Sequence, residues 1–156
     1  MKTIFIVFFL FFTTFLAQEE VLKDKNHNYL GLGIGLYKGD FGPWLQYEHG
    51  IDREWSIGLI AGSTFTYRPD FNNPRLFFTL RGAYHFNKIL ALPYQQDWYF
   101  GTGLGPKLSW SLNRVWIQVT LYTGYRYFFF RKFGIQLEFL AGINALGMNA
   151  GLIFKI

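Results

Sequence analysis

Large apolar residues alternate with glycine or polar residues along most of this chain, and this two-residue period is what most constrains its fold. Leu30, Leu32, Ile34 and Leu36 alternate with glycines, and the stretch 119–127 alternates in the same way. Successive side chains of a strand point to opposite faces, so the period predicts β-strands. The 17 glycines also disfavour helices, because each interior glycine costs a helix about 1 kcal/mol.

Turn residues divide the alternating stretches into eight predicted strands. Most of these strands are longer than the five or six residues of ordinary sheets and match the roughly 9–11 residues that a tilted strand needs to cross a bilayer. The predicted ranges are 29–38, 43–50, 54–67, 76–86, 98–108, 115–127, 134–143 and 146–156.

The two faces of these strands differ in a way that predicts a barrel in a membrane. One face is uniformly Leu, Ile, Phe, Tyr and Trp, whereas the other is rich in glycine and polar residues. Large apolar side chains would face lipid, and the small and polar ones would fill a narrow lumen. We therefore predict an all-β, eight-stranded antiparallel up-and-down transmembrane β-barrel. The alternative is a secreted lipocalin-like barrel or sandwich, but the lipid-type face favours the membrane.

Aromatic residues gather at the predicted strand ends, where they would form two interfacial girdles. These residues are Tyr29, Tyr47, Trp55, Phe86, Trp98, Tyr127 to Phe130 and Phe133 at one end, and Tyr67, Phe71, Trp110 and Trp116 at the other.

The N-terminal segment has the pattern of a secretory signal peptide. A basic start is followed by nine apolar residues at 4–12 and by a small residue, Ala17. We predict cleavage after Ala17, which gives a signal peptide at 1–17, a short periplasmic segment at 18–28 and the barrel at 29–156. The chain has no cysteine, which excludes disulfides, a thiolate nucleophile, Cys-ligated metal and lipoprotein processing.

Six charged or titratable residues fall on the predicted lumen face. An eight-stranded barrel is just wide enough for its side chains to fill, and charges buried there must be paired. On the hairpin near Arg131, Arg126 would face Gln136 and lie diagonal to Glu138. We expect an ion network that closes the bore, and a gated pore or proton path is the alternative. The set is Glu48, Arg81, His85, Arg126, Glu138 and Lys155.

The glycine ladders at 31–35 and 101–105 have a structural interpretation. They lie in the middle of predicted strands and precede no helix, so they do not indicate a dinucleotide site. We expect them to leave space for lumen aromatics such as Tyr37, Tyr99 and Tyr122. The alternative is a small interior cavity for an acyl chain.

The sequence gives little indication of catalysis, cofactors or nucleic acid. No serine lies within three residues of His27, His49 or His85, so no local Ser-His arrangement points to a hydrolase. No His/Asp/Glu cluster has metal-ligand spacing. Lys and Arg are scattered rather than arranged in a stripe, which argues against nucleic acid. We therefore predict a protein that is not an enzyme, with no cofactor and no metal.

Several runs resemble the small outer-membrane β-barrels of Gram-negative bacteria, the relatives of OmpA and OmpX that are often labelled porin-family. The runs are 47–51, 81–86, 98–105, 124–128 and 149–156. The resemblance implies an outer-membrane location, contact with outer-membrane lipid and lipopolysaccharide, and assembly by the barrel-insertion machinery. A structural or envelope-integrity role is the expected function. A narrow channel or transport component is the second, and a lipid-modifying enzyme the third.

The expected connections are short on the extracellular side, near 39–42, 68–75, 109–114 and 144–145. The longest lies on the periplasmic side, at 87–97, and carries the apolar run 89–94. It would either fold against the barrel mouth or serve as a docking site for a periplasmic or membrane partner.

Overall fold

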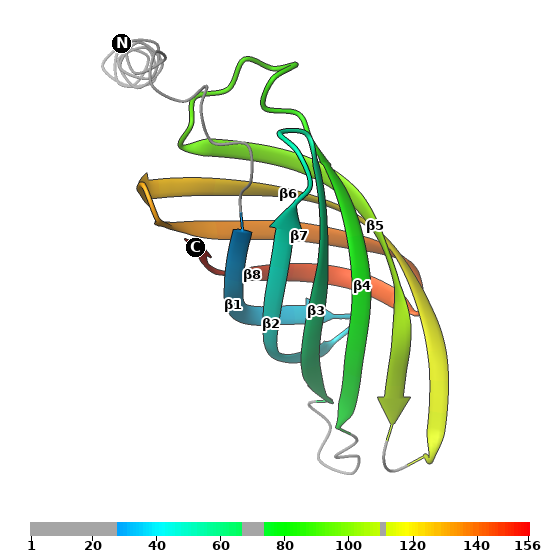
Figure 1. Cartoon of the computed structure of the whole chain (residues 1–156). Helices are drawn as coiled ribbons and strands as arrows, with labels where there is room; N and C mark the ends of the chain where they lie inside the picture. Colours follow the sequence, from blue (N-terminus) through cyan, green and yellow to red (C-terminus); the bar gives the residue numbers. More distant parts are fainter. Residues whose placement is uncertain (1–27, 67–73, 110–111) are drawn as a thin grey trace, which may run out of the picture.

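The computed structural model describes residues 28–66, 74–109 and 112–156. Within these residues eight strands form one closed antiparallel barrel, in which each strand pairs with its neighbours in sequence (Figure 1). The predicted fold class is therefore confirmed. The strands are β1 (Asn28–Tyr37), β2 (Asp40–Gly50), β3 (Trp55–Thr66), β4 (Arg75–His85), β5 (Gln96–Ser109), β6 (Arg114–Phe130), β7 (Phe133–Ile143) and β8 (Ala145–Lys155).

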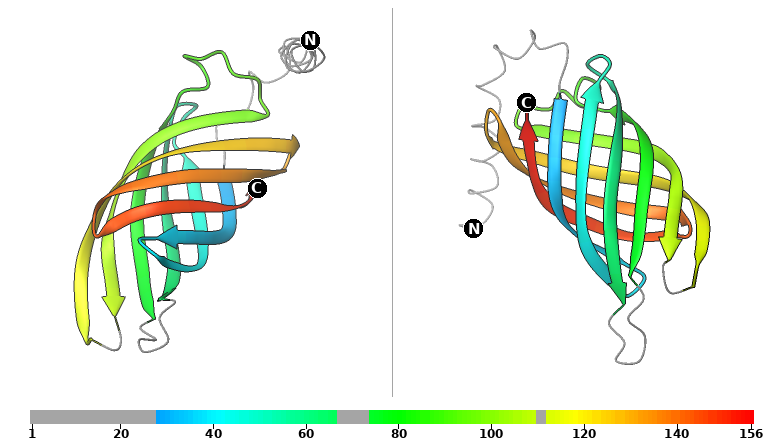
Figure 2. Two further views of the ribbon diagram at one scale, coloured as in Figure 1. Left: turned by 180° about the vertical axis from the view of Figure 1, so that it is seen from behind. Right: turned by 60° about the horizontal axis from the view of Figure 1, so that its bottom comes forward.

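The barrel closes where the first strand pairs with the last. β1 and β8 are in register from Tyr29–Lys155 to Tyr37–Gly147, and they lie side by side in Figure 2. The backbone N–H of Ile156 donates to the carbonyl of Asn28 at 2.9 Å. Both ends of the described chain thus lie at one rim, which we call the terminal rim; the opposite end is the distal rim.

The outer and inner faces are those that the alternation predicts. Leu32, Ile34 and Leu36 are exposed on the outside of β1. On β6, Leu121 is 52% exposed while Thr120 is 3% exposed. The outer surface is an apolar band around the whole barrel, and polar side chains lie inside. This is the reverse of a soluble protein, and it matches a barrel whose solvent is lipid.

The expected girdle is wrong at three positions. Trp116 has inward register, opposite Lys107 on β5. Tyr29 and Phe128 point into the lumen and are buried, where their rings stack with centroids 5.9 Å apart. The strand period, not aromatic character, decides which face a ring occupies. Trp55 and Trp98, by contrast, are about half exposed on the outside. The girdle residues Tyr67, Phe71 and Trp110 and the predicted signal peptide at 1–17 lie outside the described residues.

Several strands are longer than predicted, so the connections are shorter. β2 begins at Asp40 rather than 43, because the chain reverses in two residues, Lys38 and Gly39. Both have positive φ, 46° and 89°, as a type I′ hairpin turn requires. β5 begins at Gln96 and β6 continues to Phe130 past an irregularity between Phe128 and Phe130.

The loop between β4 and β5 is a set of tight turns at the terminal rim. Leu90 N–H donates to the Phe86 carbonyl and Leu92 N–H to the Asn87 carbonyl, both at 2.9 Å. Ile89 and Leu90 are 65% and 53% exposed. The loop therefore presents apolar side chains beside the rim. Across the described residues, no helix is both long and apolar enough to cross a membrane.

An ion pair connects this loop to the neighbouring β2–β3 turn. Lys88 Nζ lies 2.9 Å from Glu54 Oε1, and its hydrogen bond lowers the pKa of the Glu54 carboxyl. In the turn itself, the Asp52 carboxylate accepts the backbone N–H groups of Glu54 and Trp55 at 2.7 and 2.8 Å. These two bonds lower the pKa of Asp52.

Candidate functional site

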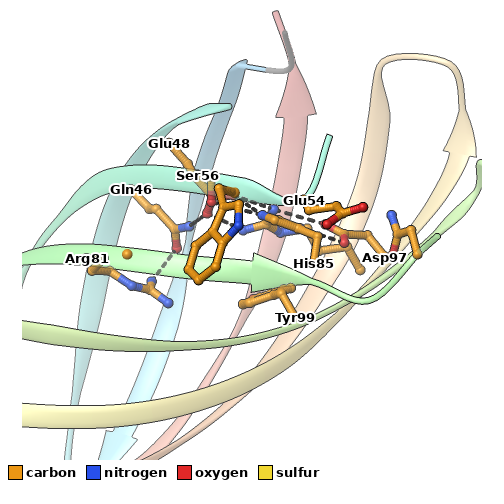
Figure 3. Close-up of polar contacts among 12 residues, drawn as sticks. Gln46, Glu48, Glu54, Ser56, Arg81, His85, Asp97 and Tyr99 are labelled. Carbon is orange, nitrogen blue, oxygen red and sulfur yellow. Dashed lines mark hydrogen bonds and ion pairs between the residues drawn. The ribbon is translucent and has the colours of Figure 1, made fainter. Parts of the chain in front are cut away.

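The terminal half of the lumen holds a network of buried charged and amide side chains. Alternate residues of β2, β4, β5, β6, β7 and β8 contribute to it, because each of these strands presents every second residue to the bore. Figure 3 shows several of these side chains pointing toward one another across the lumen. Charged groups from opposite walls thus meet in the middle.

Arg126, on β6, is the centre of this network and is 0% exposed. Its Nη1 and Nη2 donate to the two carboxylate oxygens of Glu48, at 3.0 and 2.6 Å. Nη1 also donates to Asp97 at 3.2 Å, and Nε donates to Gln136 at 3.0 Å. The guanidinium carbon lies 4.2 Å from the ring centre of Tyr99. Arg126 is therefore held by β2, β5 and β7 at once.

A second ion pair, Arg81 with Glu138, lies nearer the middle of the bore. Glu138, which is also 0% exposed, accepts hydrogen bonds from Tyr99 at 3.0 Å and Asn149 at 3.1 Å. Arg81 donates to Gln46 at 2.9 Å and lies over the ring of Tyr122, 3.7 Å from its centre.

Two glutamines link the pairs. Gln46 donates to Glu48 at 2.9 Å and accepts from Arg81, and Gln136 donates to Gln46 at 3.1 Å. The polar groups of the two pairs therefore form one connected network. Such a network is stabilising only when each of its members is satisfied.

His85 completes the charge balance of the network. Its Nδ1 lies 2.8 Å from Asp97 Oδ1 and its Nε2 lies 3.3 Å from Glu48 Oε1. Carboxylates only accept hydrogen bonds, so from these contacts we infer that both ring nitrogens carry protons and that His85 is an imidazolium. The three buried carboxylates Glu48, Asp97 and Glu138 are then matched by Arg81, Arg126 and His85.

Ser56, His85 and Asp97 have the order of contacts found in a hydrolase triad. Ser56 Oγ lies 2.9 Å from His85 Nε2, and Asp97 lies on the other ring nitrogen. Strand pairing brings these residues together, although no serine is near His85 in sequence. A triad histidine must accept the serine proton. The imidazolium inferred for His85 cannot accept it, because Nε2 already carries the proton that faces Glu48. All three side chains are buried in the wall of the filled bore.

The structure brings together most, but not all, of the charged residues expected in the lumen. Glu48, Arg81, His85, Arg126 and Glu138 are buried and belong to the network. Lys155 has inward register on β8 but lies partly exposed at the terminal rim, outside the buried set.

Arg126 and Glu138 are diagonal neighbours, as expected, but they do not form an ion pair with each other. The register is as predicted, with Arg126 opposite Gln136 and Gly124 opposite Glu138. However, Arg126 reaches across the bore to Glu48 and pairs with Asp97 on the adjacent strand β5, while Glu138 pairs with Arg81. Long side chains in a narrow lumen meet the opposite wall as readily as the adjacent strand.

Sequence reasoning also missed Asp97, which it assigned to the loop 87–97. β5 begins at Gln96, two residues before the predicted start at 98. It therefore places Asp97 inward, opposite Arg126. The alternation of Asp97, Tyr99 and Gly101 with Trp98 and Phe100 was the signal that could have extended this strand.

Large aromatic side chains occupy the space that glycines leave in the bore. The Tyr37 ring lies where a side chain on Gly35 would be, Tyr99 occupies that space over Gly124, and Tyr122 occupies it over Gly101. The expected role of the two glycine ladders, to make room for lumen aromatics, is confirmed at Gly35 and Gly101, and Gly124 plays the same part outside them.

A small cavity remains in the distal half, lined by residues that include Ile60, Phe77, Leu140, Arg81 and Lys107. The space open to the centres of water molecules is about 20 Å³, which is room for about one water molecule. In the described part of the chain, no group of three or more His, Asp or Glu residues is arranged to hold a metal ion.

A closed eight-stranded barrel with an apolar outer band and a polar, side-chain-filled bore defines the class: a small transmembrane β-barrel. No protein-family model matches the chain, and no curated protein matches its sequence.

Solved structures share the fold at low sequence identity. The N-terminal β-barrel domain of Pseudomonas aeruginosa OprF aligns with a TM-score of 0.64 and 15% identity, over 85% of this chain and 98% of that one. A de novo designed transmembrane β-barrel aligns with a TM-score of 0.64 and 14% identity, over 86% and 98%. Neisserial surface protein A aligns with a TM-score of 0.55 and 12% identity, over 84% and 96%. The chain thus has the fold of the small eight-stranded outer-membrane β-barrels.

Proposed function

We propose that this protein is an integral outer-membrane β-barrel with a structural role in the cell envelope, and that its lumen is sealed. The observation that carries the proposal is the network around Arg126, which spans the bore between opposite walls. Three carboxylates meet three cations there, so no net charge remains to attract a permeating ion.

The outer surface supports this location. Its apolar band would contact lipid acyl chains on all sides, and lipopolysaccharide would contact the half toward the distal rim. A predicted signal peptide at 1–17 would export the chain, and the barrel-insertion machinery would assemble it. We place the terminal rim in the periplasm and the distal rim outside the cell, as the even number of strands allows. Membrane fractionation, with labelling of cysteines introduced at Lys38 and Lys88, tests this arrangement.

Ion conductance in planar lipid bilayers tests the sealed lumen. We expect no stable open channel from the wild-type protein. Large and steady conductance would overturn the proposal and favour the alternative, a narrow channel or transport component. The control is a protein with Arg126→Ala and Glu48→Ala, which removes the side chains that cross the bore and should admit water.

A lipid-modifying activity has one structural feature in its favour, the Ser56–His85–Asp97 arrangement. We propose that these residues are structural, because His85 is fixed as a cation between two carboxylates. Mass spectrometry of lipid A from cells with and without the protein is the measurement. Unchanged lipid A supports the structural role, and a change in acylation that depends on Ser56 would refute it.

A further inference from the structure

The distal mouth of the lumen contains a lysine that has no ionic partner among the described residues. Lys107 of β5 has inward register, is partly buried and lines the distal cavity. Among the described residues it makes no hydrogen bond or ion pair. Arg75 of β4 pairs with Ser109, so Arg75 and Lys107 are diagonal neighbours on the same inner face. Long side chains at such positions are within reach of each other.

Arg75 has an unused hydrogen-bonding edge. Its Nη1 donates to Asp40 at 3.0 Å, whereas its Nε is buried and has no partner. The hydroxyl of Thr64, which is opposite Arg75 on β3, is likewise buried without a partner. Buried polar atoms rarely lack a partner, and those that do mark the place of a water or an ion.

The charges around this point are unbalanced. The groups whose fields act on the Lys107 ammonium are the cations Arg75 and Lys38 and the carboxylate Asp40. Asp40 is already paired with Arg75. Among the described residues, these three cations against one acid leave a net charge of +2 at the mouth, in contrast to the balanced network below.

We propose that Lys107 and Arg75 form a binding site for a phosphate group at the distal mouth of the lumen. A phosphate monoester carries about −1.5 to −2 charges at pH 7 and three strong acceptor oxygens. The Lys107 ammonium, the free Nε–H of Arg75 and the Thr64 hydroxyl supply donors of the kind that such oxygens accept. The adjoining cavity, which Lys107 lines, has room for about one water molecule, so the phosphate group would lie at the mouth above it and whatever carries it would stay outside.

Two sources have this chemistry, inorganic phosphate in the medium and the phosphate of a glycolipid headgroup. Calorimetric titration of the detergent-folded protein with inorganic phosphate tests the site. Competition by glucosamine 1-phosphate, and by lipopolysaccharide in nanodiscs that contain the protein, distinguishes the sources.

We expect saturable phosphate binding that Lys107→Met weakens by about tenfold or more, the loss typical of one charge-assisted hydrogen bond. Arg75→Met should weaken it similarly, and Lys107→Arg should retain most of it. Lys88→Met, which removes a cation at the other rim, should leave it unchanged. Each variant is first shown to be folded by its gel mobility before and after boiling.

The outcomes separate clearly. Competition by the lipid or sugar phosphate supports the site with a headgroup as its source, and binding of inorganic phosphate alone supports it with the medium as its source. Absence of phosphate binding by folded wild-type protein overturns the proposal. Phosphate binding that is equally strong in Lys107→Met and Lys88→Met also overturns it. Phosphate would then respond to the overall positive charge of the protein and not to this site.

Discussion

Replacing Arg126 with methionine would test the arrangement of charges in the lumen most directly. Methionine keeps much of the aliphatic volume and removes the guanidinium. Glu48 and Asp97 then lose their hydrogen bonds from Arg126 and remain buried. Breaking a buried ion pair by removing one partner costs about 3–5 kcal/mol. We expect this loss in the free energy of unfolding, since Arg126 is 0% exposed and bonds to both carboxylates.

The second half of the experiment asks which acid is the partner. Glu48→Gln alone should cost about 1–3 kcal/mol, because it weakens charged hydrogen bonds without removing their geometry. Combined with Arg126→Met, its cost should fall by about 1–3 kcal/mol, the coupling expected of residues in one network. Arg81→Met with Glu138→Gln should show a similar coupling. Arg126→Met with Glu138→Gln should show a smaller coupling, because these residues share a contact with Tyr99 but have different ion partners.

Urea unfolding of the protein in lipid vesicles, followed by tryptophan fluorescence and by gel mobility, supplies the free energies. Coupling between Arg126 and Glu138 as large as that between Arg126 and Glu48 would refute the partner assignment. Additive losses in all three cycles would refute the ion network itself.

Three further measurements test other parts of the structure. Gly124→Val should destabilise the barrel by about 1–3 kcal/mol through a clash with Tyr99, while Gly82→Ala, which has open space beside it, should be nearly neutral; equal losses in urea unfolding would contradict the packing. Leu121→Arg, on the outer face, should cost about 2–4 kcal/mol near the middle of the membrane and Val115→Arg, near the distal rim, about 0–1; equal costs would contradict the placement of the barrel in lipid. The Asp52 carboxyl should titrate below its usual pKa of about 3.9. Its stabilisation of the turn should be present above this pH and should be lost as the pH falls through the lowered pKa. An NMR titration midpoint at or above the ordinary pKa would show that the two backbone hydrogen bonds do not form.

The alternation of residues was sufficient to predict the eight strands and the two faces, because strand geometry determines both. The same rule places Leu121 outside and Thr120 inside, and it overrides aromatic character at Tyr29 and Phe128. Boundaries were harder to predict. Asp40 and Asp97 belong to a residue type that is common in turns. Each nevertheless lies in a strand, where its side chain pairs with an arginine in the lumen.

The partners inside the bore depend on information that a strand pattern lacks. The register of one hairpin gives the neighbours of Arg126 on β7, but Glu48 and Asp97 reach it from β2 and β5. The contact with Glu48 depends on closure and on the reach of long side chains across a narrow bore. Asp97 faces Arg126 on the paired strand β5. Ser56 and His85 likewise meet between the paired strands β3 and β4, 29 residues apart in sequence.

The seam between β1 and β8 has a consequence for the order of folding events. It joins residues from opposite ends of the described chain, such as Tyr29 and Lys155. Contacts of such long sequence separation form late, because the chain between them must be ordered first.

Until the seam closes, two strand edges carry unpaired backbone groups, which hydrocarbon does not tolerate. A partly formed sheet therefore has no stable state in the membrane core. Insertion and closure should occur as one cooperative step, with a rate that depends on how soon β8 meets β1.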